Sequence, residues 1–209
     1  LLTPNYSNIL PSEVSTSTSL SNNINLKIPL ISSAMDTVTE SKMAISIAKA
    51  GGLGIIHRNL EIKKQIIEIK KVKSKKLLIG AAVGAGAIEI KRAEALLKEN
   101  IDMIVVDTAH GHTKKVAEII TKIRKIKPKK TVLCAGNIAT AEAAKFLVSL
   151  GVDIIKVGIG PGSICTTRLV AGIGMPQLSA ILTVRKGLGN KKTKIIADGG
   201  IKFSGDIPK

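Results

Sequence analysis

The residues best suited to chemistry in this chain lie between Gly158 and Arg168, in the segment Gly-Ile-Gly-Pro-Gly-Ser-Ile-Cys-Thr-Thr-Arg. Glycines at positions 158, 160 and 162 allow the backbone to turn sharply and to approach a ligand closely. Cys165 is a potential covalent nucleophile, and short hydroxyl side chains lie on both sides of it. A glycine-rich turn with a buried, inert cysteine is the alternative, because free cysteine is among the most buried residue types. The rest of the sequence decides between the two interpretations.

Further polar residues follow the apolar runs that predict strands. They are Ser32-Ser33 with Met35-Asp36, His57-Arg58-Asn59, Asp107-Thr108 with His110 and His112, Asn137, and Asp198-Gly199-Gly200. Each of them singly could cap a helix or hold a turn. Together with the cysteine segment they make six such groups after predicted strands, which instead indicates one binding rim. Asp198 followed by two glycines suits a sugar diol beside a phosphate, because glycine exposes backbone N–H groups to an anion.

The elements that must position these residues are short apolar strands alternating with amphipathic helices. The predicted strands are Pro29–Ser33, Leu53–His57, Leu77–Val83, Met103–Asp107, Thr131–Ala135, Ile154–Gly158 and Lys194–Ala197. The predicted helices are Glu40–Ala50, Ile62–Lys73, Ile88–Glu99, Lys114–Ile126, Ala141–Leu150 and Gln177–Gly187. Thr37-x-x-Glu40 predicts a capping box, and Gly51 and Gly151 predict helix ends.

This alternation predicts an α/β fold, a (β/α)₈ TIM barrel with about seven of its eight β/α units in this chain. A doubly wound open sheet is the alternative, but no G-x-G-x-x-G motif opens a helix after the first strand. Active sites of such barrels lie at the carboxyl ends of the strands. The polar residues and the cysteine segment follow those ends. We expect residues 1–209 to form a single catalytic barrel domain.

Composition is consistent with a buried parallel sheet, since 44% of residues are hydrophobic and almost none are aromatic. The formal net charge is +17, and only five of the 32 basic residues are arginines. The lysines alternate with isoleucines in Glu61–Lys76 and Lys114–Lys130, a pattern typical of solvated outer helix faces. Nucleic-acid binding is therefore the less favoured interpretation, because aromatic side chains for base stacking are also lacking.

Two cysteines, Cys134 and Cys165, form neither a metal-binding framework nor a disulfide scaffold. Cys134 lies in an apolar run and is expected in the core. His110 and His112 alone are a weak metal signal. The chain has no apolar run of membrane-spanning length and no signal peptide pattern, so we expect a cytoplasmic protein without membrane contact. It opens at Leu1-Leu2 without Met, so we expect it to be part of a longer gene product.

Five motifs together resemble the inosine-5′-monophosphate (IMP) dehydrogenase family over essentially the whole chain. They are Ser32-Ser-Ala-Met-Asp-Thr-Val-Thr-Glu40, Val105-Val-Asp-Thr-Ala-His-Gly-His112, Ala135-Gly-Asn-Ile-Ala-Thr140, Gly158–Arg168, and Ile196-Ala-Asp-Gly-Gly-Ile201 with Ser204-Gly-Asp206. The resemblance implies NAD-dependent oxidation of IMP to XMP, the committed step of guanine nucleotide synthesis. In that family a cysteine matching Cys165 attacks the purine C2, hydride leaves to NAD⁺, and water hydrolyses the covalent intermediate.

The resemblance also implies roles for individual residues. The catalytic positions would be Cys165 and Thr167, which helps to hold the hydrolytic water. Substrate-binding positions would be Ser33, Met35, Asn137, Ser163, Asp198, Gly199 and Gly200. Positions for NAD would be Asp107, Thr108, Ala109, Gly158 and Gly160. Backbone carbonyls of Gly160, Gly162 and Cys165 would bind K⁺. IMP and NAD would be the small-molecule ligands, and the assembly would be a homotetramer.

Three features depart from the family pattern. The pair of CBS domains expected between the second helix and third strand is missing at about residues 74–75, where Lys73-Ser-Lys-Lys76 runs into Leu77. The resemblance also leads us to expect that the chain is incomplete at its carboxyl end, because the family's eighth strand with its second phosphate loop and the flap whose arginine activates water would follow Lys209. Lys202-Phe203 replaces the commoner Arg-Tyr.

Two rival functions remain open. GMP reductase, which converts GMP to IMP with NADPH, shares the barrel and the cysteine loop. Reductases tend to have Ala-Asn-Gly-Tyr where this chain has Ala109-His-Gly-His112, and Gly-Gly-Cys-Thr-Cys-Pro where it has Gly199-Gly-Ile-Lys-Phe-Ser204. The second rival is a non-catalytic basic barrel that binds nucleic acid, for which affinity would fall steeply with salt.

Overall fold

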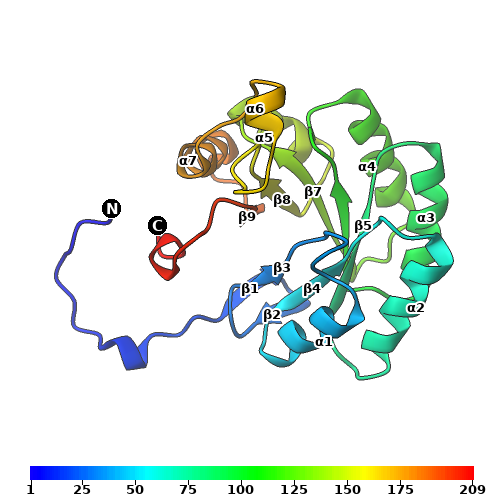
Figure 1. Cartoon of the computed structure of the whole chain (residues 1–209), viewed down its shortest axis with the longest axis horizontal. Coiled ribbons are helices and arrows are strands. Elements are labelled where there is room, and N and C mark those ends of the chain that lie inside the picture. Colours follow the sequence, from blue (N-terminus) through cyan, green and yellow to red (C-terminus); the bar gives the residue numbers. More distant parts are fainter.

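The computed structural model describes residues 1–209, and a seven-stranded parallel sheet curls through it as an open barrel (Figure 1). The strands lie side by side in chain order: β3 (Ile31–Ser32), β4 (Leu53–Ile56), β5 (Ile79–Val83), β6 (Met103–Asp107), β7 (Val132–Ile138), β8 (Ile154–Val157) and β9 (Lys194–Ala197). Sequential parallel order is the order of a β/α barrel and not of a doubly wound sheet. The predicted partial TIM barrel is confirmed.

Helices cover the outer face of this sheet (Figure 1). They are α1 (Ser41–Lys49), α2 (Ile62–Lys73), α3 (Ala87–Lys98), α4 (Lys114–Ile126), α5 (Ala141–Ser149) and α7 (Gln177–Leu188). Gly51 and Gly151 follow α1 and α5 with φ of 98° and 78°, so both predicted helix ends are confirmed. The predicted capping box is wrong: Glu40 is the N-cap of α1 and its side chain makes no capping bond. The carboxylate of Glu68 instead accepts the Ser41 N–H.

Two 3₁₀ helices, Pro11–Glu13 and Ser204–Asp206, were not predicted, and neither were three further elements. A short helix, α6 (Thr167–Val170), interrupts the long segment after β8, and a hairpin of β1 (Thr18–Ser21) and β2 (Ile24–Leu26) precedes the barrel. Strand β7 continues to Ile138, three residues past the predicted end, while β3 keeps only two residues of its predicted five. Strand β8 ends at Val157, because Gly158 adopts a φ of 151°.

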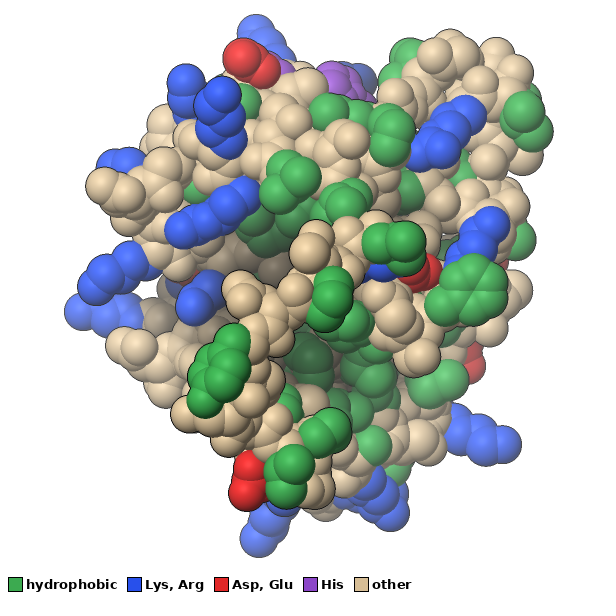
Figure 2. Space-filling view, turned by 90° about the vertical axis from the view of Figure 1, so that its left-hand side faces the viewer, with side chains coloured by type: hydrophobic (Ala, Val, Ile, Leu, Met, Phe, Trp, Pro, Cys, Tyr) green, Lys and Arg blue, Asp and Glu red, His purple; other side chains and the backbone are tan.

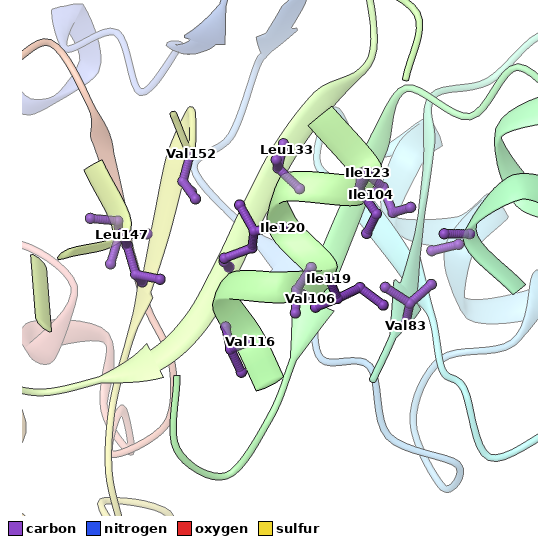
Figure 3. Close-up of a cluster of buried hydrophobic side chains, with 14 of the residues drawn as sticks. Val83, Ile104, Val106, Val116, Ile119, Ile120, Ile123, Leu133, Leu147 and Val152 are labelled. Atoms are coloured by element: carbon purple, nitrogen blue, oxygen red, sulfur yellow. The ribbon is translucent and has the colours of Figure 1, made fainter. Parts of the chain in front are cut away.

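The larger core lies between the sheet and its helices. Helix α4 places Ile119, Ile120 and Ile123 against Ile104 of β6 and Leu133 of β7, all with at most 1% of their surface exposed (Figure 3). Isoleucines at positions i, i+1 and i+4 form one apolar stripe of a helix. The lysines of α4 therefore face outward, and Figure 2 shows Lys and Arg side chains standing around the outline of the molecule.

A smaller core fills the inside of the curled sheet. Its members alternate along the strands, as side chains on one face of a sheet must. They are Leu53, Ile55, Ala82, Met103, Val105, Val132, Cys134 and Ile154, joined by Ile24 and Leu26 of β2. The hairpin and the residue after it also bond to the segments before β7 and β4, since Asn23 donates to the carbonyl of Lys130 and Lys27 donates to that of Gly51. The hairpin thus closes the amino end of the barrel and leaves the carboxyl end open for a site. None of the helices is long and apolar enough to span a membrane.

Candidate functional site

The inside of the sheet changes from apolar to charged within two residues along the strands. Met103 and Val105 of β6 belong to the inner core, and Asp107 is the next residue on that face. Ile154 of β8 is followed in the same way by Lys156. Asp198 comes directly after β9. A layer of charge at the carboxyl end of the strands therefore lies on an apolar floor.

Lys156 is the centre of this layer. Its Nζ lies 2.7 Å from Asp107 Oδ1 and 2.8 Å from Asp198 Oδ2. Its side chain is only 14% exposed. Burial alone lowers the pKa of Lys156, but the charges of Asp198 and Asp107 raise the pKa by more, so it lies above its ordinary value. The ammonium is therefore charged throughout the physiological pH range.

A glycine on the strand between them lets Lys156 reach Asp107. Gly136 of β7 pairs in register with Asp107 on one side and with Lys156 on the other. A β-carbon at position 136 would lie 2.7 Å from Cβ of Lys156 and 2.4 Å from its carbonyl oxygen. Any side chain there would collide with Lys156. The predicted motif Ala135-Gly-Asn137 therefore has a steric reason for its glycine.

Asn137 ties the same layer together from β7. Its Nδ2 donates to Asp198 Oδ2 at 2.7 Å and to the carbonyl of Gly158 at 2.8 Å. Its Oδ1 is buried and has no hydrogen-bond partner. An orphaned buried acceptor at the wall of a cavity is satisfied when a bound donor arrives. The free Oδ1 of Asp198 and Oδ2 of Asp107, which accept no bond from the protein, add to this acceptor-rich wall.

A cavity of about 250 Å³ opens over this layer. Its walls are Ser33, Ala34, Met35, Arg58, Asp107, Thr108, Ala109, Asn137, Lys156 and Asp198. Four predicted substrate positions and three predicted NAD positions are therefore brought together. The other predicted positions do not line it. Thr167 begins α6, and the rest lie on adjoining loops: Ser163, Gly199, Gly200, Gly158, Gly160, Gly162 and Cys165.

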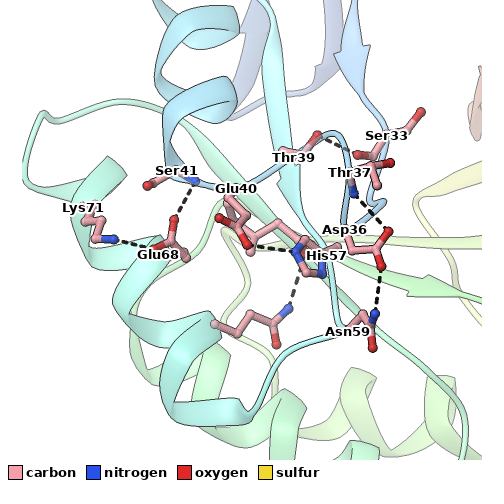
Figure 4. A network of polar contacts seen from close by, with 12 residues as sticks. Ser33, Asp36, Thr37, Thr39, Glu40, Ser41, His57, Asn59, Glu68 and Lys71 are labelled. Carbon is pink, nitrogen blue, oxygen red and sulfur yellow. Dashed lines mark hydrogen bonds and ion pairs between the residues drawn. The ribbon is translucent and has the colours of Figure 1, made fainter.

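A polar network stabilises the β3–α1 loop, which carries Ser33 and Met35 (Figure 4). Thr39 Oγ1 donates to the carbonyl of Ser33 at 2.6 Å, and Asn59 Nδ2 donates to Asp36 Oδ2 at 2.9 Å. Nε2 of the buried His57 lies 3.4 Å from Glu40 Oε1. His57 is thus a support of the β3–α1 loop, in line with the structural interpretation weighed for it.

Cys165 lies on the loop between β8 and α6, with its Sγ 3.2 Å from Thr167 Oγ1. Hydrogen bonding by the Thr167 side chain, then by its backbone N–H, lowers the pKa of Cys165, and the charge of Arg168 acts in the same direction. Partial burial acts against them. Reactive cysteines typically have a depressed pKa and are partly exposed, and Cys165 meets both conditions.

Cys134 provides the internal comparison, because it lies within β7 with none of its surface exposed. Burial raises the pKa of Cys134 to about 12. A thiol in that state is a packing residue, as predicted.

The cysteine loop packs against the Gly199-Gly200 turn that follows Asp198. Both glycines have positive φ, 82° and 78°, and a β-carbon on Gly200 would lie 3.1 Å from Pro161. Gly158 approaches more closely still, since a β-carbon there would lie 2.1 Å from the carbonyl of Asp198. These contacts connect the cysteine loop to the cavity through Asp198. Ser163 stands exposed on the loop.

The carbonyls predicted to hold K⁺ suit a cation that binds oxygen ligands. The Gly162 carbonyl accepts the Cys165 N–H at 3.1 Å, while those of Gly160 and Cys165 accept no hydrogen bond within the chain. Gly160 has a φ of 71°, a conformation that favours glycine. Of the positions predicted for NAD, Asp107 keeps one carboxylate oxygen free to accept from a hydroxyl, whereas the Thr108 hydroxyl donates to the Gly136 carbonyl at 2.8 Å. Nowhere do three His, Cys, Asp or Glu residues gather as a metal site, and His112 packs on Phe146 instead.

Three residues of the cavity wall were not among the predicted site residues: Ala34, Arg58 and Lys156. A lysine inside the apolar run Ile154–Val157 was the available signal, since a buried strand keeps a charge only when it is paired. Arg58 was noted after its strand, but its place in the cavity wall follows only from the curvature of the sheet.

Comparison with known proteins agrees with this geometry. The family model described as the IMP dehydrogenase / GMP reductase domain matches residues 1–209. An inosine-5′-monophosphate dehydrogenase of Borreliella burgdorferi is 46% identical over all of this chain and 64% of its own length. Those of Cryptosporidium parvum and Aquifex aeolicus are 44% and 34% identical, with 62% and 69% of their lengths covered. The chain spans less than two thirds of the first two relatives. It belongs to the IMP dehydrogenase / GMP reductase family.

Proposed function

We propose that the protein oxidises IMP to XMP with NAD, using Cys165 as a covalent nucleophile, and that residues 1–209 form its catalytic barrel. One observation carries the proposal. Residues that the family pattern assigns to the purine nucleotide and residues that it assigns to the nicotinamide nucleotide line the same cavity, from both sides of Lys156. Two ligands held over one apolar floor are in position to exchange hydride directly.

Cys165 supplies the nucleophile in this proposal. Its lowered pKa increases the fraction of thiolate at neutral pH, and the thiolate adds to C2 of the purine. The new C–S bond would make C2 a hydride donor, and NAD⁺, when bound, would supply the hydride acceptor. Water then attacks C2, the C–S bond breaks, and the thiol is regenerated as XMP leaves. Thr167, whose hydroxyl lies 3.2 Å from Sγ, would hold that water.

The cavity wall orients the two nucleotides. Asp198 Oδ1 is free to accept from the IMP ribose hydroxyls, while its Oδ2 is fixed by Asn137 and Lys156. Asp107 Oδ2 is free to accept from the nicotinamide ribose in the same way. On the adjoining loops, the hydroxyl of Ser163 and the backbone groups of Gly199 and Gly200 would bind the phosphate of IMP. K⁺ on the carbonyls of Gly160, Gly162 and Cys165 would hold the loop in shape. A cytoplasmic homotetramer is part of the proposal.

The direct test is turnover by the full-length protein in a buffer containing K⁺. With IMP and NAD⁺ we expect NADH and XMP in equal amounts. With GMP and NADPH we expect no IMP, which separates the dehydrogenase from the reductase. IMP formed from GMP and NADPH, with no NADH formed from IMP, would overturn the proposal in favour of the reductase. Salt-sensitive nucleic-acid binding with no binding of IMP would favour the basic barrel.

A further inference from the structure

We propose that Lys156 is a positioning residue that couples the two nucleotide sites by holding Asp107 and Asp198 with one ammonium group. The inference rests on the proposed function, because it assigns the two carboxylates to the two nucleotides. Neither the family motifs quoted above nor the predicted site residues include Lys156. Its contacts make it the only group that touches both carboxylates.

The geometry leaves Lys156 little freedom. Its Nζ is bonded at 2.7 and 2.8 Å to carboxylates that approach from different strands, and its stem passes the bare backbone of Gly136. Below it lie Cys134 and Ile154 of the apolar floor. The ammonium therefore cannot follow one carboxylate without lengthening its bond to the other. A shift of either aspartate on ligand binding is transmitted to the second aspartate.

The bonding pattern also shows why this lysine serves ligands and not only the fold. Each aspartate offers Lys156 one oxygen and keeps the other free of bonds from the protein, and both aspartates line the cavity. Neither carboxylate accepts a backbone N–H from a neighbouring strand. Without Lys156, two carboxylates would face each other across the cavity with no buried cation to balance them, and both would turn toward water. The raised pKa of Lys156 is consistent with its balancing both charges.

The experiment measures binding in the full-length protein with Cys165→Ala as background, so that both ligands can be present without turnover. Titration calorimetry gives the Kd of IMP alone, of NAD⁺ alone, and of NAD⁺ at saturating IMP. Lys156→Met removes the charge at similar length, and Lys156→Arg keeps it. The matched control is Lys73→Met, because Lys73 pairs with Asp102 at 3.3 Å away from the cavity.

We expect Lys156→Met to raise both Kd values about tenfold or more, the loss typical of removing one partner of a buried charge pair. We also expect the effect of bound IMP on the Kd of NAD⁺, about fivefold or more in the background protein, to fall to about one. Lys156→Arg should restore most of both effects, and Lys73→Met should leave all three Kd values unchanged.

Three results would overturn the inference. Lower stability with unchanged Kd values would make Lys156 purely structural. Weaker binding of one ligand alone, with that of the other intact, would remove the coupling. A background protein that binds neither IMP nor NAD⁺ would end the proposed function itself, and this inference with it, which distinguishes the two failures.

Discussion

Aspartates at the two ends of the same sheet have different hydrogen-bond partners. At the amino end, Asp102 accepts the N–H of Ile79 at 2.9 Å and Asp153 accepts the N–H of Leu133 at 2.8 Å. Each satisfies a backbone donor of the neighbouring strand and pairs with a lysine, Lys73 or Lys127. At the carboxyl end, Asp107 and Asp198 accept no backbone donor from a strand and share Lys156.

The difference follows from what each end must satisfy. A carboxylate committed to a backbone N–H stabilises the fold but has less acceptor capacity left for a ligand. A carboxylate held only by side chains keeps an oxygen free. The hairpin β1–β2 closes the amino end with Ile24 and Leu26, while the carboxyl end has only loops above it. One sheet thus separates stability at one end from binding at the other.

The largest expected effect is on the nucleophile of the carboxyl end. Cys165→Ala should lower kcat for IMP oxidation by at least about 10³-fold, because the covalent route is lost. The melting temperature should hardly change, since the side chain lies on a partly exposed loop. Initial rates of NADH formation and a thermal melt measure both. Cys165→Ala turnover close to that of the parent protein would refute the covalent mechanism.

Substitution of Asp198 should have a smaller effect, and that effect should be weaker binding of IMP. Asp198→Ala should raise the KM for IMP about 10- to 100-fold, because the ribose hydroxyls and Asn137 lose their acceptor in a closed site. Steady-state kinetics with varied IMP measure this. An unchanged KM together with lower thermal stability would class Asp198 with the aspartates of the amino end.

Substitution of Asp153, at the amino end, should lower stability and leave IMP binding intact. Asp153→Ala leaves the buried N–H of Leu133 without its acceptor, so we expect a loss of about 1–3 kcal/mol in the free energy of unfolding. The KM for IMP should stay within about twofold, an energy change below 1 kcal/mol. Urea denaturation and kinetics on the same preparation test the separation of the two ends. A higher KM with full stability would contradict it.

The smallest effect concerns Glu68 at the α1–α2 contact. Burial raises its pKa, but bonds from Lys71 and Ser41 lower the pKa by more, so the net pKa lies below 4.5. The carboxylate therefore adds stability above its ordinary pKa, and that contribution is lost as the pH falls through the folded value. Glu68→Gln should cost less than about 1 kcal/mol at pH 7. The difference from the parent protein should shrink as the pH falls below the ordinary pKa of a glutamate and vanish once the pH is below the lowered pKa of folded Glu68. A difference that grows on acidification would be the wrong sign.

Elements with strong local signals could be predicted from the sequence, and tertiary contacts account for the rest. Isoleucine stripes between glycines located the helices and strands within a few residues. The hairpin at residues 18–26 escaped because its serine-rich strands carry little hydrophobic alternation and are stabilised by docking under the barrel. The capping interaction of α1 was mispredicted because Glu68, 27 residues from Ser41, takes the place of a local cap.

The candidate site shows the same division. Motifs identified Asp107, Asn137 and Asp198, which lie at the carboxyl ends of their strands. The role of Lys156 depends on the register of three strands and on the space left by Gly136. Neither can be predicted from a short segment of the sequence.

The central claim is that reactive chemistry belongs to the carboxyl-end loops, and differential alkylation of the two cysteines tests it most directly. The full-length protein is treated with limiting iodoacetamide over a pH series, with and without IMP, and digested for mass spectrometry. We predict labelling of Cys165 that sets in at a lower pH than for an ordinary thiol, protection of Cys165 by IMP, and no labelling of Cys134 in the folded protein. Preferential labelling of Cys134, or labelling of Cys165 that IMP leaves unchanged, would contradict the account.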